Sequence, residues 1–157
     1  MADEERATPE AAVTVEVAGI ARGNPGLAGA GIVIVDEKGA TLTHVARYLG
    51  NAQPLEAQLQ ALLLALRYAR PYTPAPLTLI LNNDTAVRQI GGEAPARHPA
   101  VLRVLADLDT LLAPFAGATY HLARGEELAE AMRLANLGID TRLRPLPSYD
   151  PPLPAGA

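Results

Sequence analysis

Residues 18–31 read AGIARGNPGLAGAG and follow directly on the alternating run VTVEV at residues 13–17. Alternation with β-branched residues predicts a half-buried strand, and the glycines, asparagine and proline that follow predict a loop. The next segment, GAGIVIVDEKG at 29–39, is again β-branched and ends in a turn. The stretch therefore predicts two strands joined by a glycine-proline loop, with Ala18 where the first strand ends.

The rest of the chain predicts a mixture of strands and helices. A third strand is expected over 40–49, and its short link to the second strand indicates a hairpin. Leucines recur at helical spacing from 55 to 70, and prolines end that helix. The wholly apolar LTLIL at 77–81 predicts a central strand covered on both faces. Further elements are a helix after the cap cluster at 82–85, an amphipathic helix over 98–115, a strand over 118–123 and a helix over 126–139.

The order β-β-β-α-β-α-α-β-α predicts an α/β fold with a five-stranded mixed sheet. Its first three strands are antiparallel, and helical crossovers add the last two. We expect a disordered N-terminal tail at 1–11, one domain at 12–142 and a proline-rich tail at 143–157 whose composition favours an extended polyproline form. A chain of 157 residues fits one domain with a sizeable core.

Composition excludes several classes of protein. Hydrophobic residues make up 49 % and charged residues 19 %, a globular balance. No apolar run approaches the roughly 20 residues of a membrane helix, and the acidic, polar N-terminus is unlike a secretory signal, so a cytoplasmic protein without a membrane partner is expected. The absence of cysteine excludes disulfides and thiolate metal sites. With a net charge of −4, binding to nucleic acid has to rely on a local patch and is expected to be weak to moderate.

Four segments, in chain order, resemble the ribonuclease H family, closest to its bacterial type I enzymes. ARGNPGLAGAGIVIVD is similar to the family's first hairpin, D-G-A-x-R-G-N-P-G-x-A-G-x-G, and EAQLQALLLAL to its helix E-A-E-Y-x-A-L-x-x-A-L. LNNDTAVRQIGG is similar to S-D-S-x-x-V-x-x-Q-I-x-G, and YHLAR followed by AMRLAN to H-V-P-R and A-D-x-L-A-N. The resemblance runs from about Val13 to Asp140 and implies the ribonuclease H-like fold.

The resemblance also implies which residues carry the chemistry. The family hydrolyses the RNA strand of RNA–DNA hybrids with two Mg²⁺ ions held by four carboxylates, as a two-metal mechanism and a hard cation require. Those four positions fall here on Ala18, Gln58, Asn82 and Met132. None is an acid, so the resemblance implies no catalytic residue, no metal ligand and no Mg²⁺ cofactor.

Nearby acids leave one alternative. Glu16 shares a strand face with Ala18, one pleat repeat away, and a shifted last helix brings a glutamate inward. The acids that rebuild part of a metal site under this interpretation are Glu16, Glu56, Asp84 and Glu130.

Residues of the hairpin and one later loop are the candidates for nucleic-acid binding. In the family, the hairpin lies in the minor groove of the hybrid, near the RNA 2′-hydroxyls, and such contacts read RNA by shape. A loop arginine, here Arg124, reaches a phosphate. The candidate binding residues are Arg22, Gly23, Asn24, Pro25, Gly26 and Arg124. The three histidines, His44, His98 and His121, are scattered along the chain and do not indicate a metal site.

Three hypotheses follow from these residues. The first is a catalytically inactive ribonuclease H-like domain that binds RNA or an RNA–DNA hybrid without cleaving it. The second is a structural or protein-interaction module that keeps only the fold and binds a protein partner or forms a homodimer. Acidic charge, an aromatic content of 4 % and Pro54 and Leu55 in place of the family's DNA-contacting asparagines favour it. The third is an active hybrid ribonuclease with displaced carboxylates.

Overall fold

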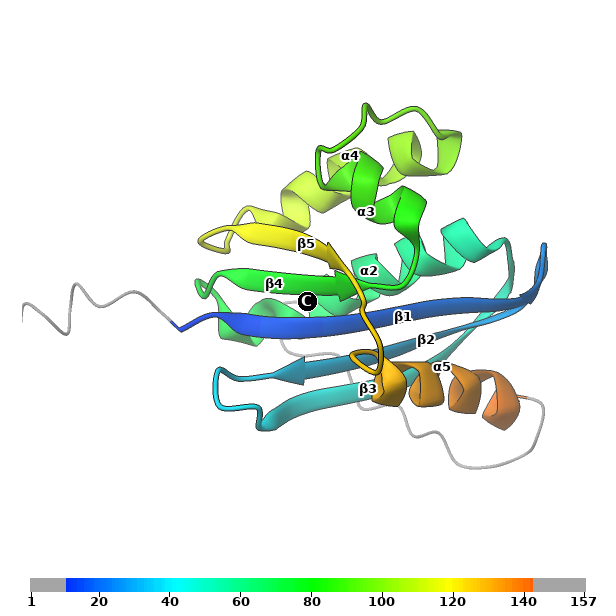
Figure 1. The fold of residues 1–157 in the computed structure, drawn as a ribbon, viewed down its shortest axis with the longest axis horizontal. Helices are drawn as coiled ribbons and strands as arrows, with labels where there is room; N and C mark the ends of the chain where they lie inside the picture. The colour runs from blue at the N-terminus through cyan, green and yellow to red at the C-terminus, as the bar shows by residue number, and fades with distance from the viewer. Residues whose placement is uncertain (1–10, 143–157) are drawn as a thin grey trace, which may run out of the picture.

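A five-stranded mixed sheet with helices on both faces makes up the computed structural model, which describes residues 11–142 (Figure 1). Except for residue 11, the expected tails at 1–11 and 143–157 lie outside the described residues. The strands are β1 (Val13–Gly23), β2 (Gly26–Val35), β3 (Thr41–Ala52), β4 (Leu77–Leu81) and β5 (Ala118–Leu122). The helices are α2 (Pro54–Ala69), the short 3₁₀ helix η1 (Arg70–Tyr72), α3 (Asp84–Ile90), α4 (Pro99–Leu112) and α5 (Ala129–Arg142).

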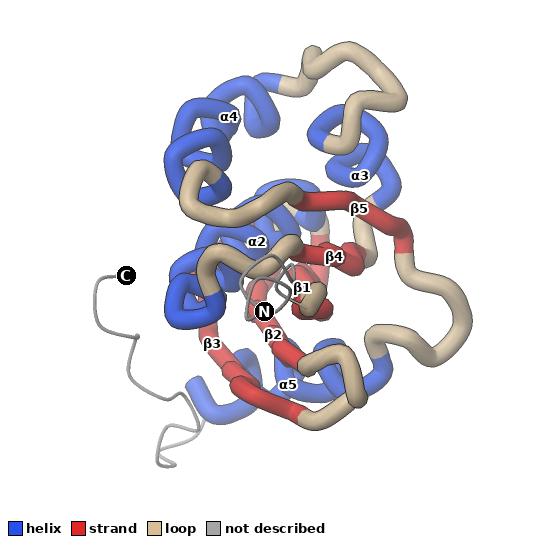
Figure 2. Tube along the Cα trace, turned by 90° about the vertical axis from the view of Figure 1, so that its left-hand side faces the viewer, coloured by secondary structure: helices blue, strands red, loops and turns tan. Residues whose placement is uncertain are grey.

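The sheet has the order β3-β2-β1-β4-β5. β1 pairs antiparallel with β2, and β2 with β3, whereas β4 runs parallel to both β1 and β5. This confirms the predicted fold class and element order. In Figure 2, α5 lies on one face of the sheet, and α2 on the other with α4 and α3 beyond it. β4 runs parallel to the first half of β1 and ends opposite Val17, so the carboxyl end of β4 lies beside the middle of β1, where the first turns of α2 pack against Gly19.

Most of the predicted glycine-proline loop is in fact strand. β1 and β2 stay paired from Thr14 opposite Val35 to Gly23 opposite Gly26, which leaves only Asn24 and Pro25 as the turn. Several of the glycines serve close packing. A side chain at Gly31 or Gly29 would collide with the backbone of α5, and one at Gly19 with the backbone of α2.

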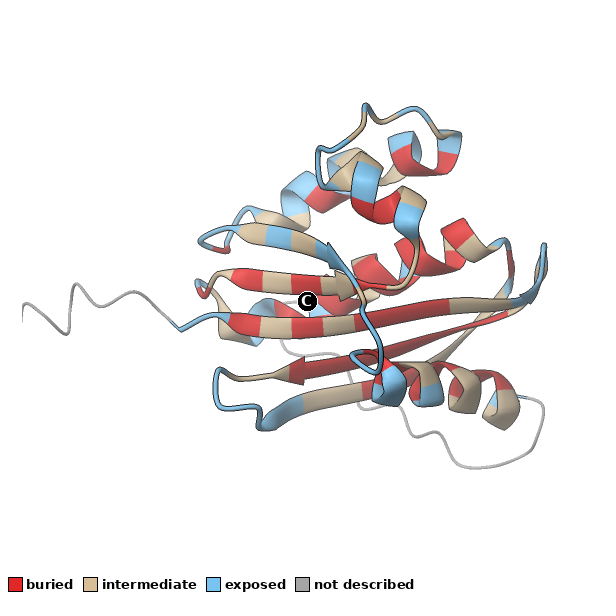
Figure 3. Ribbon diagram, in the orientation of Figure 1, coloured by how far each residue is buried: buried red, intermediate tan, exposed pale blue. Residues whose placement is uncertain are grey.

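Each face of the sheet buries its own apolar cluster (Figure 3). On the α2 face, side chains such as Val15, Val17 and Leu79 pack against the leucines of α2. On the α5 face, small side chains dominate, and Ala18 packs with Ala131 and Leu134. α2 and α5 together bury both faces of β1, so the groups along the middle of this strand are held in place.

Three predictions about the helices and β4 were wrong in detail. β4 is not covered on both faces, because α5 packs on β1, β2 and β3, and Thr78 and Ile80 remain half-buried. The amphipathic helix expected over 98–115 spans Pro99–Leu112, and one of its leucines, Leu102, is 51 % exposed, since α4 packs on α2 and α3 with its other side. The last helix begins at Ala129 rather than at 126, because three-residue turns with bonds such as Ala129 N–H to Glu126 C=O precede it.

Candidate functional site

The four positions that the sequence resemblance assigns to metal ligands lie around the middle of β1, near the carboxyl end of β4. Gln58 lies on the second turn of α2, and Asn82 directly follows β4. Their groups touch, because the Asn82 backbone N–H donates to the Gln58 side-chain oxygen at 2.6 Å. Ala18 and Met132 share one apolar cluster between β1 and α5. The amides of Gln58 and Asn82 therefore meet beside β1, whereas Ala18 and Met132 pack between β1 and α5, and none of the four residues is acidic.

Gln58 connects three backbone segments through its side-chain amide. It is fully buried, and its Oε1 accepts the backbone N–H groups of Asn82 and Asn83 at 2.6 and 2.7 Å. Its Nε2 donates to the Val17 carbonyl at 3.2 Å. Two N–H donors on one side and a carbonyl on the other fix the orientation of the amide. Only a group that both donates and accepts can satisfy this arrangement.

Asn82 extends the pairing of β1 with β4 beyond the last residue of β4. The backbone register ends at Val17 opposite Leu81. One step further, the Asn82 Oδ1 accepts the Gly19 N–H and its Nδ2 donates to the Gly19 carbonyl, both at 2.9 Å. The side-chain amide thus takes the place of a peptide group of the partner strand. We call the hydrogen bonds of Gln58 and Asn82 together the amide network.

These residues do not fit a Mg²⁺ site. Magnesium binds oxygen ligands, usually carboxylates together with water. Ala18 is buried and offers no ligand atom, and both amides are engaged with backbone groups. The thioether of Met132 is a soft ligand within an apolar cluster. Within residues 11–142, no group of three or more histidine, aspartate or glutamate side chains is arranged to hold a metal ion.

Three of the four alternative acids have cationic partners of their own. Glu56 also accepts the Gln53 backbone N–H at 3.0 Å, which caps the start of α2. Asp84 lies in the first turn of α3 and Glu130 in that of α5. The ion pairs are Glu56–Arg103 at 3.7 Å, Asp84–Arg88 at 3.3 Å and Glu130–Arg133 at 2.6 Å. The Arg133 hydrogen bond lowers the pKa of Glu130.

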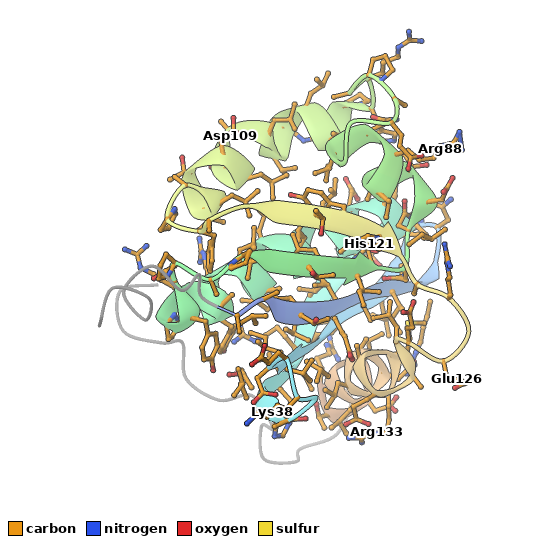
Figure 4. The ribbon with its side chains drawn as sticks, turned by 60° about the vertical axis from the view of Figure 1, so that its left-hand side comes forward. Lys38, Arg88, Asp109, His121, Glu126 and Arg133 are labelled. Carbon is orange, nitrogen blue, oxygen red and sulfur yellow. The ribbon has the colours of Figure 1, made fainter. Side chains whose placement is uncertain are left out.

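Glu16 is the fourth alternative acid and has a different environment. The strand registers place it in a row across the sheet between Val33 of β2 and Ile80 of β4, with His121 next on β5. In Figure 4, His121 lies near the end of β5, and Glu126 lies on the loop that leads to α5. Burial raises the pKa of Glu16, and repulsion from Glu127 and Glu130 raises it further.

Replacing Glu16 by glutamine is expected to stabilise the protein at neutral pH. The pKa of Glu16 is higher in the folded state than in the unfolded state, so the folded state binds more protons at pH values between these two pKa values. The stability of the protein therefore falls as the pH rises through that interval. Glu16→Gln removes this loss, so its advantage is present at pH 7 and absent near pH 3. Urea unfolding at both pH values measures it, and Glu37→Gln in the exposed turn after β2 is the control. Equal stability of the Glu16→Gln and native proteins at pH 7 contradicts this expectation.

The hairpin residues divide into an exposed tip and a braced arginine. Gly23, Asn24 and Pro25 are exposed at the turn between β1 and β2. Arg22, in contrast, donates to the side chains of Asn136 at 3.0 Å and Asp140 at 2.9 Å, so its guanidinium braces the hairpin on α5. The amide of Asn136 and the acid of Asp140 lie 114 and 118 residues away from Arg22 in sequence, so these contacts were not predicted from the hairpin sequence.

Arg124 lines a cleft that sequence reasoning missed. Its side chain is exposed, and its backbone N–H donates to the Glu127 carboxylate at 2.7 Å. The cleft, about 670 Å³ in volume, lies between β4, β5, α3 and the loop before α5. Its charged lining consists of Asp84, Glu93 and Glu127 with Arg88 and Arg124. The half-buried face of β4 forms part of it, and the apolar sequence of β4 had indicated a covered strand.

Comparison with known proteins gives consistent matches. A family model described as reverse transcriptase-like matches residues 16–138. The bifunctional protein Rv2228c of Mycobacterium tuberculosis is 26 % identical over 129 residues, which cover 82 % of this chain and 35 % of that protein. The chain thus spans about a third of the length of the curated relatives it matches.

Solved structures match over most of their length. Ribonuclease H1 from the archaeon Halobacterium salinarum aligns with a TM-score of 0.76 and 26 % identity, over 82 % of this chain and 98 % of that one. LC11 ribonuclease H1, solved in complex with an RNA/DNA hybrid, aligns with a TM-score of 0.78 and 29 % identity, over 83 % and 99 %. The N-terminal ribonuclease H domain of Rv2228c aligns with a TM-score of 0.78 and 25 % identity, over 86 % and 98 %. Among the described helices, none is long and apolar enough to cross a membrane.

Proposed function

Since the chain belongs to the reverse transcriptase-like family and is a ribonuclease H-like domain, we propose that it binds RNA or an RNA–DNA hybrid without cleaving it. The observation that carries the proposal is the amide network. At the place where the family's chemistry needs carboxylates, both amides bind backbone groups, and Ala18 and Met132 add apolar contacts. A nucleic acid bound here meets no group that could hold the two metal ions of the reaction.

The binding surface in this proposal is the exposed hairpin tip together with Arg124. The tip offers the backbone of Gly23 and the side chain of Asn24, which suit the 2′-hydroxyls of a minor groove. Arg124 supplies a positive charge to a phosphate. The complex of LC11 ribonuclease H1 with an RNA/DNA hybrid supports this class of ligand. Arg22 contributes by holding the hairpin on α5 rather than by contacting the ligand.

One set of samples tests both halves of the proposal. Fluorescence anisotropy of labelled RNA–DNA hybrid, double-stranded RNA and single-stranded RNA measures affinity over a series of salt concentrations. The same mixtures, incubated with Mg²⁺ or Mn²⁺, are then run on a denaturing gel. We expect salt-dependent binding of the hybrid or an RNA, and intact RNA strands with either metal. Metal-dependent cleavage of the hybrid contradicts the loss of catalysis, and a flat titration for all three ligands contradicts binding.

Arg124→Ala is expected to weaken that binding for every sequence alike. A side chain that pairs with one phosphate releases about one counterion, so its removal reduces the slope of log affinity against log salt by about one. Arg70→Ala is the matched control, because Arg70 is also exposed but follows α2 at the opposite end of the sheet. Equal slopes for the two variants contradict the role of Arg124.

A second candidate function is a protein-interaction module, which the charges of the cleft favour. Asp84, Glu93 and Glu127 outnumber the arginines around it, and carboxylates without a metal ion repel phosphates. If this function is correct, all three nucleic acids fail to bind and the purified protein forms a dimer or carries a partner. Size-exclusion chromatography with light scattering on the samples of the titration distinguishes it from the first proposal.

A further inference from the structure

A groove between β3 and α2 lies apart from the cleft and has a different chemistry. It has a volume of about 340 Å³, within the size range of small-ligand sites. Its floor and walls are apolar and aromatic, with a positive charge at either side. The lining residues are Tyr48, Leu49, Leu63 and Leu64, with the polar Gln60 and the cationic Arg47 and Arg67. We call this the β3–α2 groove.

The leucines of the groove are only partly buried by the rest of the domain. Leu49, Leu63 and Leu64 pack on the main core but keep intermediate exposure. β3 is an edge strand of the sheet, so no further strand of the described domain lies beyond the groove. Additional burial of these three side chains would be favourable, at roughly 25 cal/mol per Å² of apolar surface.

The end of α5 reaches the rim of this groove. Arg142, the last residue that the structure describes, places its guanidinium 4.9 Å from the centre of the Tyr48 ring, within the range of a cation–π contact. The chain therefore leaves the described domain directly beside Tyr48. Residues 143–157, LRPLPSYDPPLPAGA, continue from this point.

The sequence of that segment complements the groove. Prolines alternate with leucines and one tyrosine, and proline-rich segments bind in grooves lined by aromatic side chains with a small entropic cost. The segment carries two charged side chains, Arg144 near its start and Asp150 further along, and Asp150 is the one that can pair with the exposed Arg67 of the groove. At about 3.1 Å per residue in a polyproline conformation, Asp150 lies up to roughly 25 Å of chain from Arg142.

We propose that residues 143–150 of the same chain bind in the β3–α2 groove, with their leucines and Tyr149 against Tyr48, Leu63 and Leu64 and with Asp150 paired to Arg67. The occupied groove is a site that a protein partner with a similar proline-rich sequence must compete for. This inference does not depend on nucleic-acid binding, so it stands or fails separately from the proposed function.

A single fluorophore tests the proposal in the full chain. The chain contains no tryptophan, so Tyr149→Trp introduces the only one. We expect its emission maximum at a shorter wavelength than in the isolated peptide 143–157 with the same substitution, because the docked indole is shielded from water. Arg67→Glu in the same background is expected to move the maximum to the value of the peptide. Combining Arg67→Glu with Asp150→Lys is expected to restore it, since the swapped charges attract again.

The control is Arg70→Glu, the same charge reversal three residues further along and outside the groove. It should leave the emission unchanged, and circular dichroism melting checks that all variants fold. The proposal is overturned if the Tyr149→Trp protein has the same emission maximum as the isolated peptide. It is also overturned if Arg67→Glu does not change that maximum. A maximum that shifts on dilution also overturns it, because the segment then binds in a second copy rather than in its own chain.

Discussion

Replacing Gln58 by glutamate is expected to lower the free energy of unfolding by about 3 kcal/mol at pH 8. The carboxylate can accept the N–H groups of Asn82 and Asn83 as the amide does. Its second oxygen, however, faces the Val17 carbonyl, to which the amide nitrogen now donates. A fully buried residue has no water to relieve this repulsion. The loss of the donor and the burial of a charge therefore act in the same direction.

The destabilisation should depend on pH in a defined sense. A protonated carboxyl can again donate to the Val17 carbonyl, so the folded state favours the neutral acid and raises its pKa. The folded form then binds more protons than the unfolded form, and the stability of the variant decreases as pH rises from the unfolded value of about 4.3 upward. Urea unfolding of Gln58→Glu and the native protein at a series of pH values measures the difference.

Gln60→Glu is the matched control, because Gln60 lies on the same helix and is exposed. It is expected to change stability by less than about 0.5 kcal/mol. If Gln58→Glu is as stable as Gln60→Glu at pH 8, the donor role of the amide is wrong. Asn82→Asp loses its donation to the Gly19 carbonyl in the same way, but a smaller effect is expected, because Asn82 is only half-buried.

Gly31→Ala is expected to cost about 2 kcal/mol and to loosen α5. A Cβ at Gly31 would overlap the Ala131 carbonyl and lie 2.6 Å from the Ala135 nitrogen, both in the backbone of α5. Backbone atoms cannot rotate away as a side-chain end does, so the helix has to shift and open the apolar cluster around Ala18. The gain in strand propensity of alanine over glycine, about 0.5–1 kcal/mol, has the opposite sign and is smaller.

Thermal unfolding and hydrogen exchange of α5 amides measure this effect. A loss of about 2 kcal/mol corresponds to a fall in Tm of roughly 4–8 °C for a domain of this size. Gly39→Asn is the control: Gly39 has φ +84, a conformation that asparagine tolerates, and no atom lies within 4 Å of a Cβ there. If the amide hydrogens of α5 exchange at the same rate in Gly31→Ala as in the native protein, the packing of α5 does not depend on this glycine.

The sequence predicted the sheet and its order of elements because periodicity is a local signal. The position of the hairpin turn was predicted wrongly because glycine occurs both in turns and where two backbones pack closely. At Gly31 it permits a helix to approach a strand, and this partner lies about 100 residues away in the chain. The same limit applies to β4, whose apolar sequence was taken as burial on both faces although α5 covers only the neighbouring strands.

The resemblance assigned positions to the candidate site, but the hydrogen bonds that those residues make could not be predicted from the sequence. The motifs indicated that Gln58 and Asn82 replace carboxylates. Each amide both donates to and accepts from backbone groups, which belong to β1 and to the two residues after β4, and these bonds depend on strand register, which the sequence does not specify. The engagement of Arg22 by Asp140 likewise arises only when α5 packs beside the hairpin.

Because Gln58 and Asn82 each use both a donor and an acceptor, substitution of either residue by an acid is disfavoured. Each single reversion to an acid removes a bond before a cation can compensate, since one or two carboxylates do not make a divalent site. A protein with a single acidic substitution at Gln58 or Asn82 is then less stable than the present chain. Sequence drift at Gln58 and Asn82 is therefore biased toward keeping the amide network uncharged, and a metal site requires several coordinated substitutions at once.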